Sequence, residues 1–103
     1  MKSKRAKATD IPLKVKKAVW ERDGHKCIIC DSASAMPNAH YIPRSKGGLG
    51  IEENVVTMCG TCHYMYDFGN KAQRQGLRHQ IREYLMSQYP DWDEDKLIYK
   101  KWS

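Results

Sequence analysis

Four cysteines in two pairs are the residues whose type and spacing point most directly to chemistry. Cys27 and Cys30 form one C-x-x-C pair, and Cys59 and Cys62 form a second pair 28 residues later. A tight turn over each pair brings both sulfurs to one side, and four thiolates satisfy tetrahedral Zn²⁺ with no position left open. The pattern predicts a structural zinc site. The gap exceeds the ~15–20 residues of a plain zinc ribbon, so we expect it to carry the function.

Polar residues inside and just after that gap form a second candidate site. His40 is suited to act as a general base near neutral pH, and Asn54 can hold it by accepting its ring N–H. His63 and Asp67 are four residues apart, so a helix places both on one face, where they can grip one divalent cation. Together they predict hydrolysis of a phosphodiester, with His40 deprotonating water and the cation stabilising charge on the phosphate.

Each of these residues also has a plainer interpretation. A lone histidine is more often a packing or surface residue than a ligand or a base. Arg44 and Lys46 follow His40 in a loop, where we expect them to contact DNA phosphates; exposed loop charges are the alternative. For the four cysteines, the plainer interpretation is a metal site that only stabilises the fold.

Short elements separated by glycine and proline must position these residues. Val15 and Val19 belong to a helical pattern over 11–22, with Asp10 as the expected N-cap. The remaining predicted elements are a hairpin of 38–42 and 55–58 across a glycine-rich loop at 45–50, a helix from Cys59 to about Gly69, a helix over 71–88, and a last helix after Pro90.

The two C-terminal helices are expected to complete the core and to present charge. Leu77, Ile81 and Leu85 mark the apolar face of the 71–88 helix. A basic stripe on the same helix either is a solvated face or flanks a nucleic-acid groove; it comprises Lys71, Arg74, Arg78 and Arg82. The last helix is expected to open on an acidic capping box at Asp91 and Glu94 and to anchor through Trp92, Leu97, Tyr99 and Trp102.

Composition and charge set the class of protein. A chain of 103 residues that is 41% hydrophobic is long enough for one small core and too apolar to be disordered. Its apolar runs fall far short of the ~18 residues of a membrane span, and its N-terminus has no apolar signal core, so we expect a soluble cytoplasmic protein. Residues 1–26 hold nine basic and three acidic side chains, which accounts for the whole net charge of +6. We therefore expect a flexible basic arm over 1–10 that suits a polyphosphate, or serves only as a solubilising tail.

Several stretches together carry a resemblance to a known family. They are Cys27-Ile28-Ile29-Cys30, AHYIPRSKGG over 39–48, NVVTM over 54–58 and Cys59-Gly60-Thr61-Cys62-His63. Over about residues 11–69 the chain resembles the HNH nucleases in their four-cysteine zinc form. The segment YPDWDEDKLIYKKW near the C-terminus is similar to small HNH proteins of phages and bacteria.

This resemblance implies a treble-clef-like ββα-metal fold of the α+β class, with the zinc site beside a catalytic ion. It implies a single domain over 11–103, with the core motif at 25–69 and a helical extension at 70–103. The implied activity is metal-dependent hydrolysis of double-stranded DNA.

The resemblance also implies roles for single residues. His40 would be the general base, Asn54 would orient it and hold the loop, and His63 would bind the catalytic cation with Asp67. Many family members carry Asp or His where this chain has Ala39, so we expect Asp67 and water to compensate. Mg²⁺ or Mn²⁺ suits such a site, with Ni²⁺ or Zn²⁺ as alternatives.

Two other functions remain open from the sequence. One is a zinc-stapled module that binds DNA without cutting it, as an accessory to a phage packaging or restriction system, and whose binding weakens steeply with salt. The other is an adaptor that binds a phage or bacterial protein through Trp92, Tyr99 and Trp102. Aromatic residues of a terminal helix are, however, more often part of the core.

Overall fold

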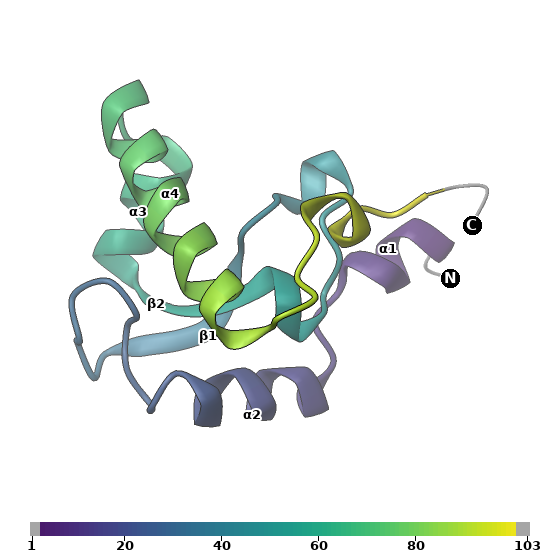
Figure 1. The fold of residues 1–103 in the computed structure, drawn as a ribbon, viewed down its shortest axis with the longest axis horizontal. Helices are drawn as coiled ribbons and strands as arrows, with labels where there is room; N and C mark the ends of the chain where they lie inside the picture. The colour runs from purple at the N-terminus through teal and green to yellow at the C-terminus, as the bar shows by residue number, and fades with distance from the viewer. Residues whose placement is uncertain (1–2, 101–103) are drawn as a thin grey trace.

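A computed structural model describes residues 3–100 of the chain (Figure 1). Over these residues the protein is a small α+β domain with a two-stranded sheet. Its helices and strands are, in order, α1 (Lys4–Thr9), α2 (Leu13–Arg22), β1 (Ala35–His40), β2 (Val55–Cys59), α3 (Gly60–Phe68) and α4 (Lys71–Gln88). Short 3-10 turns lie at Arg44–Lys46, Glu52–Asn54 and Glu94–Leu97. In the described part of the chain, no helix has both the length and the apolar character needed to span a bilayer.

The sheet is an antiparallel pair whose register shifts once. Ala35 pairs with Cys59 at one end and His40 pairs with Val55 at the other, with an irregularity between Met36 and Ala39. Pro37 lies in this irregular stretch, where its missing N–H costs no ladder hydrogen bond. The predicted hairpin is confirmed, although β1 begins and ends earlier than residues 38–42.

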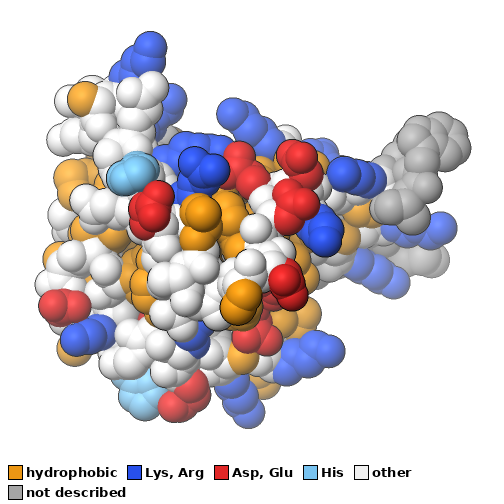
Figure 2. Space-filling model, in the orientation of Figure 1, with side chains coloured by type: hydrophobic (Ala, Val, Ile, Leu, Met, Phe, Trp, Pro, Cys, Tyr) orange, Lys and Arg blue, Asp and Glu red, His pale blue; other side chains and the backbone are white. Residues whose placement is uncertain are grey.

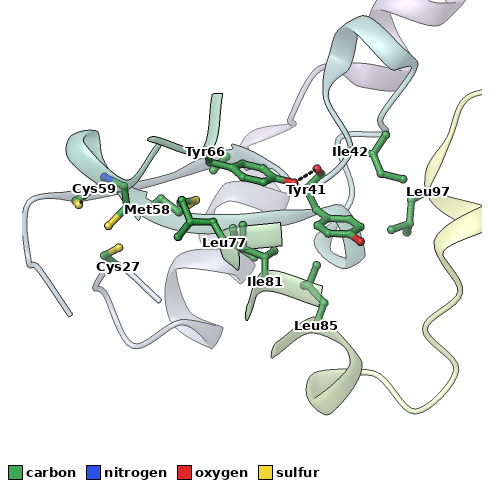
Figure 3. Close-up of a cluster of buried hydrophobic side chains, with 13 residues drawn as sticks. Cys27, Tyr41, Ile42, Met58, Cys59, Tyr66, Leu77, Ile81, Leu85 and Leu97 are labelled. Atoms are coloured by element: carbon green, nitrogen blue, oxygen red, sulfur yellow. Dashed lines mark hydrogen bonds between the residues drawn. The ribbon is translucent and has the colours of Figure 1, made fainter. Parts of the chain in front are cut away.

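Helices cover the sheet and complete the core. α2 packs along β1 and β2, and α3 joins β2 to α4 (Figure 1). The predicted apolar face of α4 is confirmed, because Leu77, Ile81 and Leu85 are buried in the same core cluster as Tyr41 of the loop after β1 (Figure 3). Tyr66 of α3 donates a hydrogen bond to the Tyr41 carbonyl at 2.6 Å, so the two helices are tied to the end of β1.

A buried ion pair ties α2 to the rest of the molecule. The Arg22 guanidinium contacts both carboxylate oxygens of Asp23 and donates to the carbonyls of Glu52 and Val55, each at 2.7 Å. Asp23 in turn accepts from the backbone N–H of Thr57 at 2.8 Å. Since every charge here has several internal partners, the pair joins α2 and β2 without leaving an unsatisfied ion.

The N-terminal segment departs from the expected flexible arm. Residues Lys4–Thr9 form α1, and Asp10 ends this helix instead of capping α2, which begins at Leu13 after Pro12. α1 is held against the glycine-rich loop, because Arg5 donates to the carbonyl of Ser45 at 3.0 Å and Gly50 donates to the carbonyl of Ala8 at 3.0 Å. The close approach of this loop to its neighbours requires glycine; a Cβ on Gly48 would lie 1.7 Å from the Ile42 carbonyl oxygen.

The last predicted helix is reduced to a single 3-10 turn at Glu94–Leu97, which Asp93 caps in place of Asp91. The prediction that Trp92 packs into the core is confirmed. Its ring lies edge-on to that of Tyr41, with the ring centroids 5.7 Å apart, and its indole N–H donates to the Glu53 carbonyl. These contacts argue against Trp92 as an adaptor contact. The adaptor residue Trp102 lies outside the described residues.

Candidate metal centre

A tight turn positions the first cysteine pair. The backbone N–H of Asp31 donates to the Cys27 carbonyl at 3.0 Å, and Asp31 adopts the left-handed conformation, with φ of 65°, that closes the turn. Ile28 donates to the Thr57 carbonyl at 3.0 Å, which fastens the turn to β2. The backbone N–H of Ile29 points back at the Cys27 sulfur at 3.4 Å. These hydrogen bonds fix the turn that carries Cys27 and Cys30 beside β2.

The second pair lies where β2 passes into α3. Cys59 is the last residue of β2 and the N-cap of α3, and its sulfur accepts from the backbone N–H of Cys62 at 3.4 Å. That hydrogen bond lowers the pKa of Cys59 to about 7. Burial instead raises the pKa of Cys62. The hydrogen bond at the start of α3 therefore favours the Cys59 thiolate, whereas burial opposes the Cys62 thiolate.

The four sulfurs converge as the sequence predicts. One ligand atom from each of Cys27, Cys30, Cys59 and Cys62 lies within 4.8 Å of all the others. The sulfurs of Cys30 and Cys59 are 3.5 Å apart, which is beyond a disulfide bond of ~2.05 Å. Two thiolates on one tetrahedral ion, with bonds of ~2.3 Å, lie about 3.8 Å apart. The spacing fits four ligands of one metal ion.

The surroundings of the sulfurs also fit a cation. Cys27, Cys59 and Cys62 are buried, whereas Cys30 is exposed (Figure 3 shows Cys27 and Cys59 at one end of the core). Several thiolates this close cannot all carry charge in an apolar setting unless a cation neutralises them. The residues present can thus bind a metal.

The other predicted site residues, except the buried Asn54, line a separate cleft of about 890 Å³ beside α3. The structure brings His40, His63 and Asp67 to this cleft, together with Arg44 and Lys46. It also places Lys71, Arg74 and Arg78 of the α4 basic stripe there, but not Arg82. Below, the basic cleft means this cavity with its five cationic side chains, which are Arg44, Lys46, Lys71, Arg74 and Arg78.

His40 contacts a partner that the sequence did not predict. Its Nε2 lies 2.9 Å from the backbone carbonyl of Thr9, at the end of α1. Burial lowers the pKa of His40, and the nearby Arg44 acts in the same direction. No local sequence pattern marks Thr9, because its contact depends on how α1 docks on the loop.

The Asn54 side chain hydrogen-bonds to the loop and not to His40. Its side-chain oxygen accepts from the backbone N–H of Ile42 at 2.8 Å, and its side-chain nitrogen donates to the carbonyls of Ile42 and Leu49. These three hydrogen bonds satisfy a fully buried amide. The expected role in holding the loop is present, whereas the expected hydrogen bond to the ring N–H of His40 is not.

The structure does not support a catalytic cation at the helix. His63 and Asp67 are on one face of α3 as expected, with their Nε2 and Oδ2 atoms 3.3 Å apart. Within residues 3–100, however, the four cysteines form the one group of three or more potential ligands close enough to share an ion. The prediction of a second metal site at these two residues therefore lacks a third protein ligand.

Comparison with known proteins gives the family. No protein-family model matches this chain, and no solved structure matches it significantly. Among curated proteins, anaredoxin from Nostoc sp. is 33% identical over 57 residues, which cover 54% of this chain and 75% of that protein. The chain belongs to the anaredoxin family.

This finding contradicts the expected identity and activity. The relative is named as a redoxin, not as a nuclease. The prediction of an HNH endonuclease that hydrolyses DNA is therefore wrong, as is the classification of the protein as a hydrolase. The alternative of a zinc-stapled DNA-binding module loses its support with the HNH resemblance. The resemblance rested on short stretches around the four cysteines, His40, Asn54 and His63, and a four-thiolate frame is shared by sites of different function.

Proposed function

We propose that this protein is an electron carrier whose redox centre is a single iron ion held by Cys27, Cys30, Cys59 and Cys62. The observation that carries the proposal is the convergence of four sulfurs within 4.8 Å. Membership of the anaredoxin family supports a redox role. The expected structural zinc is the competing occupant, because tetrahedral thiolate sites accept zinc as well as iron.

The donor set favours one ion over a multi-iron cluster. In a cluster the cysteines bind different iron atoms, which separates their sulfurs more widely than a single ion does. Zn²⁺ has no redox chemistry, whereas an iron ion with four thiolate ligands supplies one-electron exchange. The single-iron site therefore reconciles the sulfur spacing with the redox family.

The four-cysteine centre is exposed to solvent on one side and shielded from it on the other. Cys30 is exposed, so its sulfur offers an edge that a redox partner can approach. Cys27 has no exposed surface, which keeps water from the opposite side. Hydrogen bonds from backbone N–H groups to the sulfurs of Cys27 and Cys59 disperse thiolate charge. Such bonds and solvent exposure are the features that set the potentials of iron–thiolate centres.

The test is metal content combined with redox spectroscopy of the full chain. Protein purified without added metal, and protein reconstituted with ferrous iron, would be assayed for iron, zinc and acid-labile sulfide. We expect one iron per chain, no sulfide, and visible absorption bands that bleach with dithionite and return with air. Cys27→Ser should abolish these bands, whereas Ser34→Ala, an exposed serine in the same loop, should leave them unchanged.

Two results would overturn the proposal. Zinc that ferrous iron cannot replace, with no reversible absorption, would establish a structural site. Two or more irons with stoichiometric sulfide would establish a cluster instead of the single ion.

A further inference from the structure

The basic cleft carries more positive charge than the carboxylates that line it can neutralise. Five cationic side chains line it, and Asp67 is the one carboxylate among its lining residues. The carboxylate of Asp67 lies 3.3 Å from Nε2 of His63, so it is directed toward its own helix. The cleft therefore presents a concentrated positive potential to solvent, which attracts an anionic partner.

The five cations differ in how they are held. Arg44 pairs with Asp10, and Arg78 pairs with Glu94 at 3.2 Å. In the described part of the chain, no carboxylate forms an ion pair with the other three, which are Lys46, Lys71 and Arg74. All three are exposed. Figure 2 shows Lys and Arg side chains gathered beside the helices α3 and α4.

An exposed aromatic pair lies on the same helix as the cleft wall. Tyr64 is 65% exposed and Phe68 is 71% exposed, and their ring centroids are 5.2 Å apart. Phe68 also lines the basic cleft. Aromatic and arginine side chains are enriched in protein–protein interfaces, where an apolar anchor lies beside charged groups. A small anion bound in the cleft would leave Tyr64 uncovered. The combined surface therefore fits a macromolecule better than a metabolite.

The position of α3 relates this surface to the cysteines. Cys62 lies in the first turn of α3, and the next residue, His63, lines the cleft. The helix ends at Phe68. A partner seated in the cleft is therefore brought within a few residues of the proposed redox centre, on the same helix.

From these observations we infer that the basic cleft and the aromatic pair Tyr64 and Phe68 dock an acidic partner protein, which exchanges electrons with the cysteine centre. The choice of a redox partner rests on the proposed function. Carboxylates of the partner pair with Lys46, Lys71 and Arg74, and an apolar side chain covers Phe68. Charge complementarity of this kind raises the association rate and selects the partner.

Binding of defined probes tests the inference on the full chain. The first probe is a fluorescein-labelled 12-residue peptide of six glutamates and six leucines, and the second is a 12-base-pair DNA duplex with the same label. We expect the peptide to bind more tightly than the duplex at 50 mM NaCl. We also expect its affinity to fall about tenfold at 300 mM NaCl, because exposed charges are screened.

Matched variants locate the binding surface. The double variant Lys71→Gln and Arg74→Gln should weaken peptide binding at least tenfold. The control variant Lys14→Gln and Lys17→Gln removes the same charge from exposed positions of α2 outside the cleft, and should change affinity less than twofold. Phe68→Ala should weaken the peptide while leaving binding of a dodecamer of glutamate alone nearly unchanged.

Three outcomes would overturn the inference. Equal weakening by the two double variants would mean that the chain binds anions through its overall charge. Tighter binding of the duplex, lost in the cleft variant, would make the cleft a nucleic-acid site. An unchanged affinity of the peptide for Phe68→Ala would show that Phe68 is not an apolar anchor for the partner. Peptide binding needs no iron, so a failure of the redox proposal appears separately, as peptide binding by a protein without reversible absorption.

Discussion

The cationic side chains of two regions meet very different surroundings. Arg22 is nearly enclosed, contacts both oxygens of Asp23, and donates to two backbone carbonyls. Lys71 and Arg74 in the basic cleft are exposed and have no ion pair with a described carboxylate. Both regions are built from the same types of residue, and α4 contributes to both, through Tyr84 beside Arg22 and through its first turns in the cleft.

The difference separates charge that serves folding from charge that serves binding. A buried ion stabilises the native state only if its partners are already present inside the protein. Exposed ions that repel one another add nothing to folding, so their concentration in one cleft points to an external anion. Three variants would break or sharpen this distinction.

The largest effect is expected at Arg22. Arg22→Met should lower the free energy of unfolding by about 3–5 kcal/mol, because it leaves the Asp23 carboxylate buried without its counter-ion. Arg82→Met is the control, since Arg82 is half exposed and lies 3.9 Å from Glu94; its loss should cost at most ~1 kcal/mol. Urea unfolding of the metal-loaded proteins measures both. Similar losses in the two variants would erase the distinction between the regions.

His40 lies between the two extremes, because it lines the cleft yet is partly buried against Thr9. Burial lowers its pKa in the folded state, so the unfolded chain binds the proton more readily. The stability from neutral His40 is therefore present above pH ~6.5 and lost as the pH falls from there through the folded pKa. Urea midpoints measured between pH 7.5 and 5.5 should fall less steeply in His40→Gln than in the wild type. The control His79→Gln removes an exposed histidine and should keep the pH dependence of the wild type. If His40→Gln also keeps the pH dependence of the wild type, His40 is not the source of it.

The smallest effect on stability is expected in the cleft itself. The double variant Lys71→Gln and Arg74→Gln should unfold within about 0.5 kcal/mol of the wild type, because exposed substitutions away from special features rarely do more. A slight gain is consistent with relief of like-charge repulsion. Thermal unfolding by circular dichroism measures the change. A loss of more than 1 kcal/mol would show that these side chains support the fold, and would weaken the case for a docking surface.

Local patterns predicted the regular elements well and their ends less well. The apolar repeat of Leu77, Ile81 and Leu85 located α4, because helical periodicity and burial of one face coincide there. Asp10 was wrongly expected to cap α2, because a good N-cap type carries no information about a helix that precedes it. The prediction of a last helix was wrong for a related reason. Asp91 and Glu94 match a capping pattern, but the chain that follows forms a short 3-10 turn and is held by a backbone hydrogen bond from Leu49 to the Leu97 carbonyl.

The cysteine spacing by itself predicted four sulfurs that converge closely enough to hold one metal ion, because two C-x-x-C pairs can be recognised without knowing the fold. The function drawn from the surrounding histidines did not follow, since the same frame supports different chemistry. Only the tertiary structure decided that Cys30 is the exposed cysteine of the four, that Asn54 binds the loop, and that cations from the loop after β1 and from α4 share one cleft with α3. Those facts depend on contacts between residues distant in the chain, which no local pattern records.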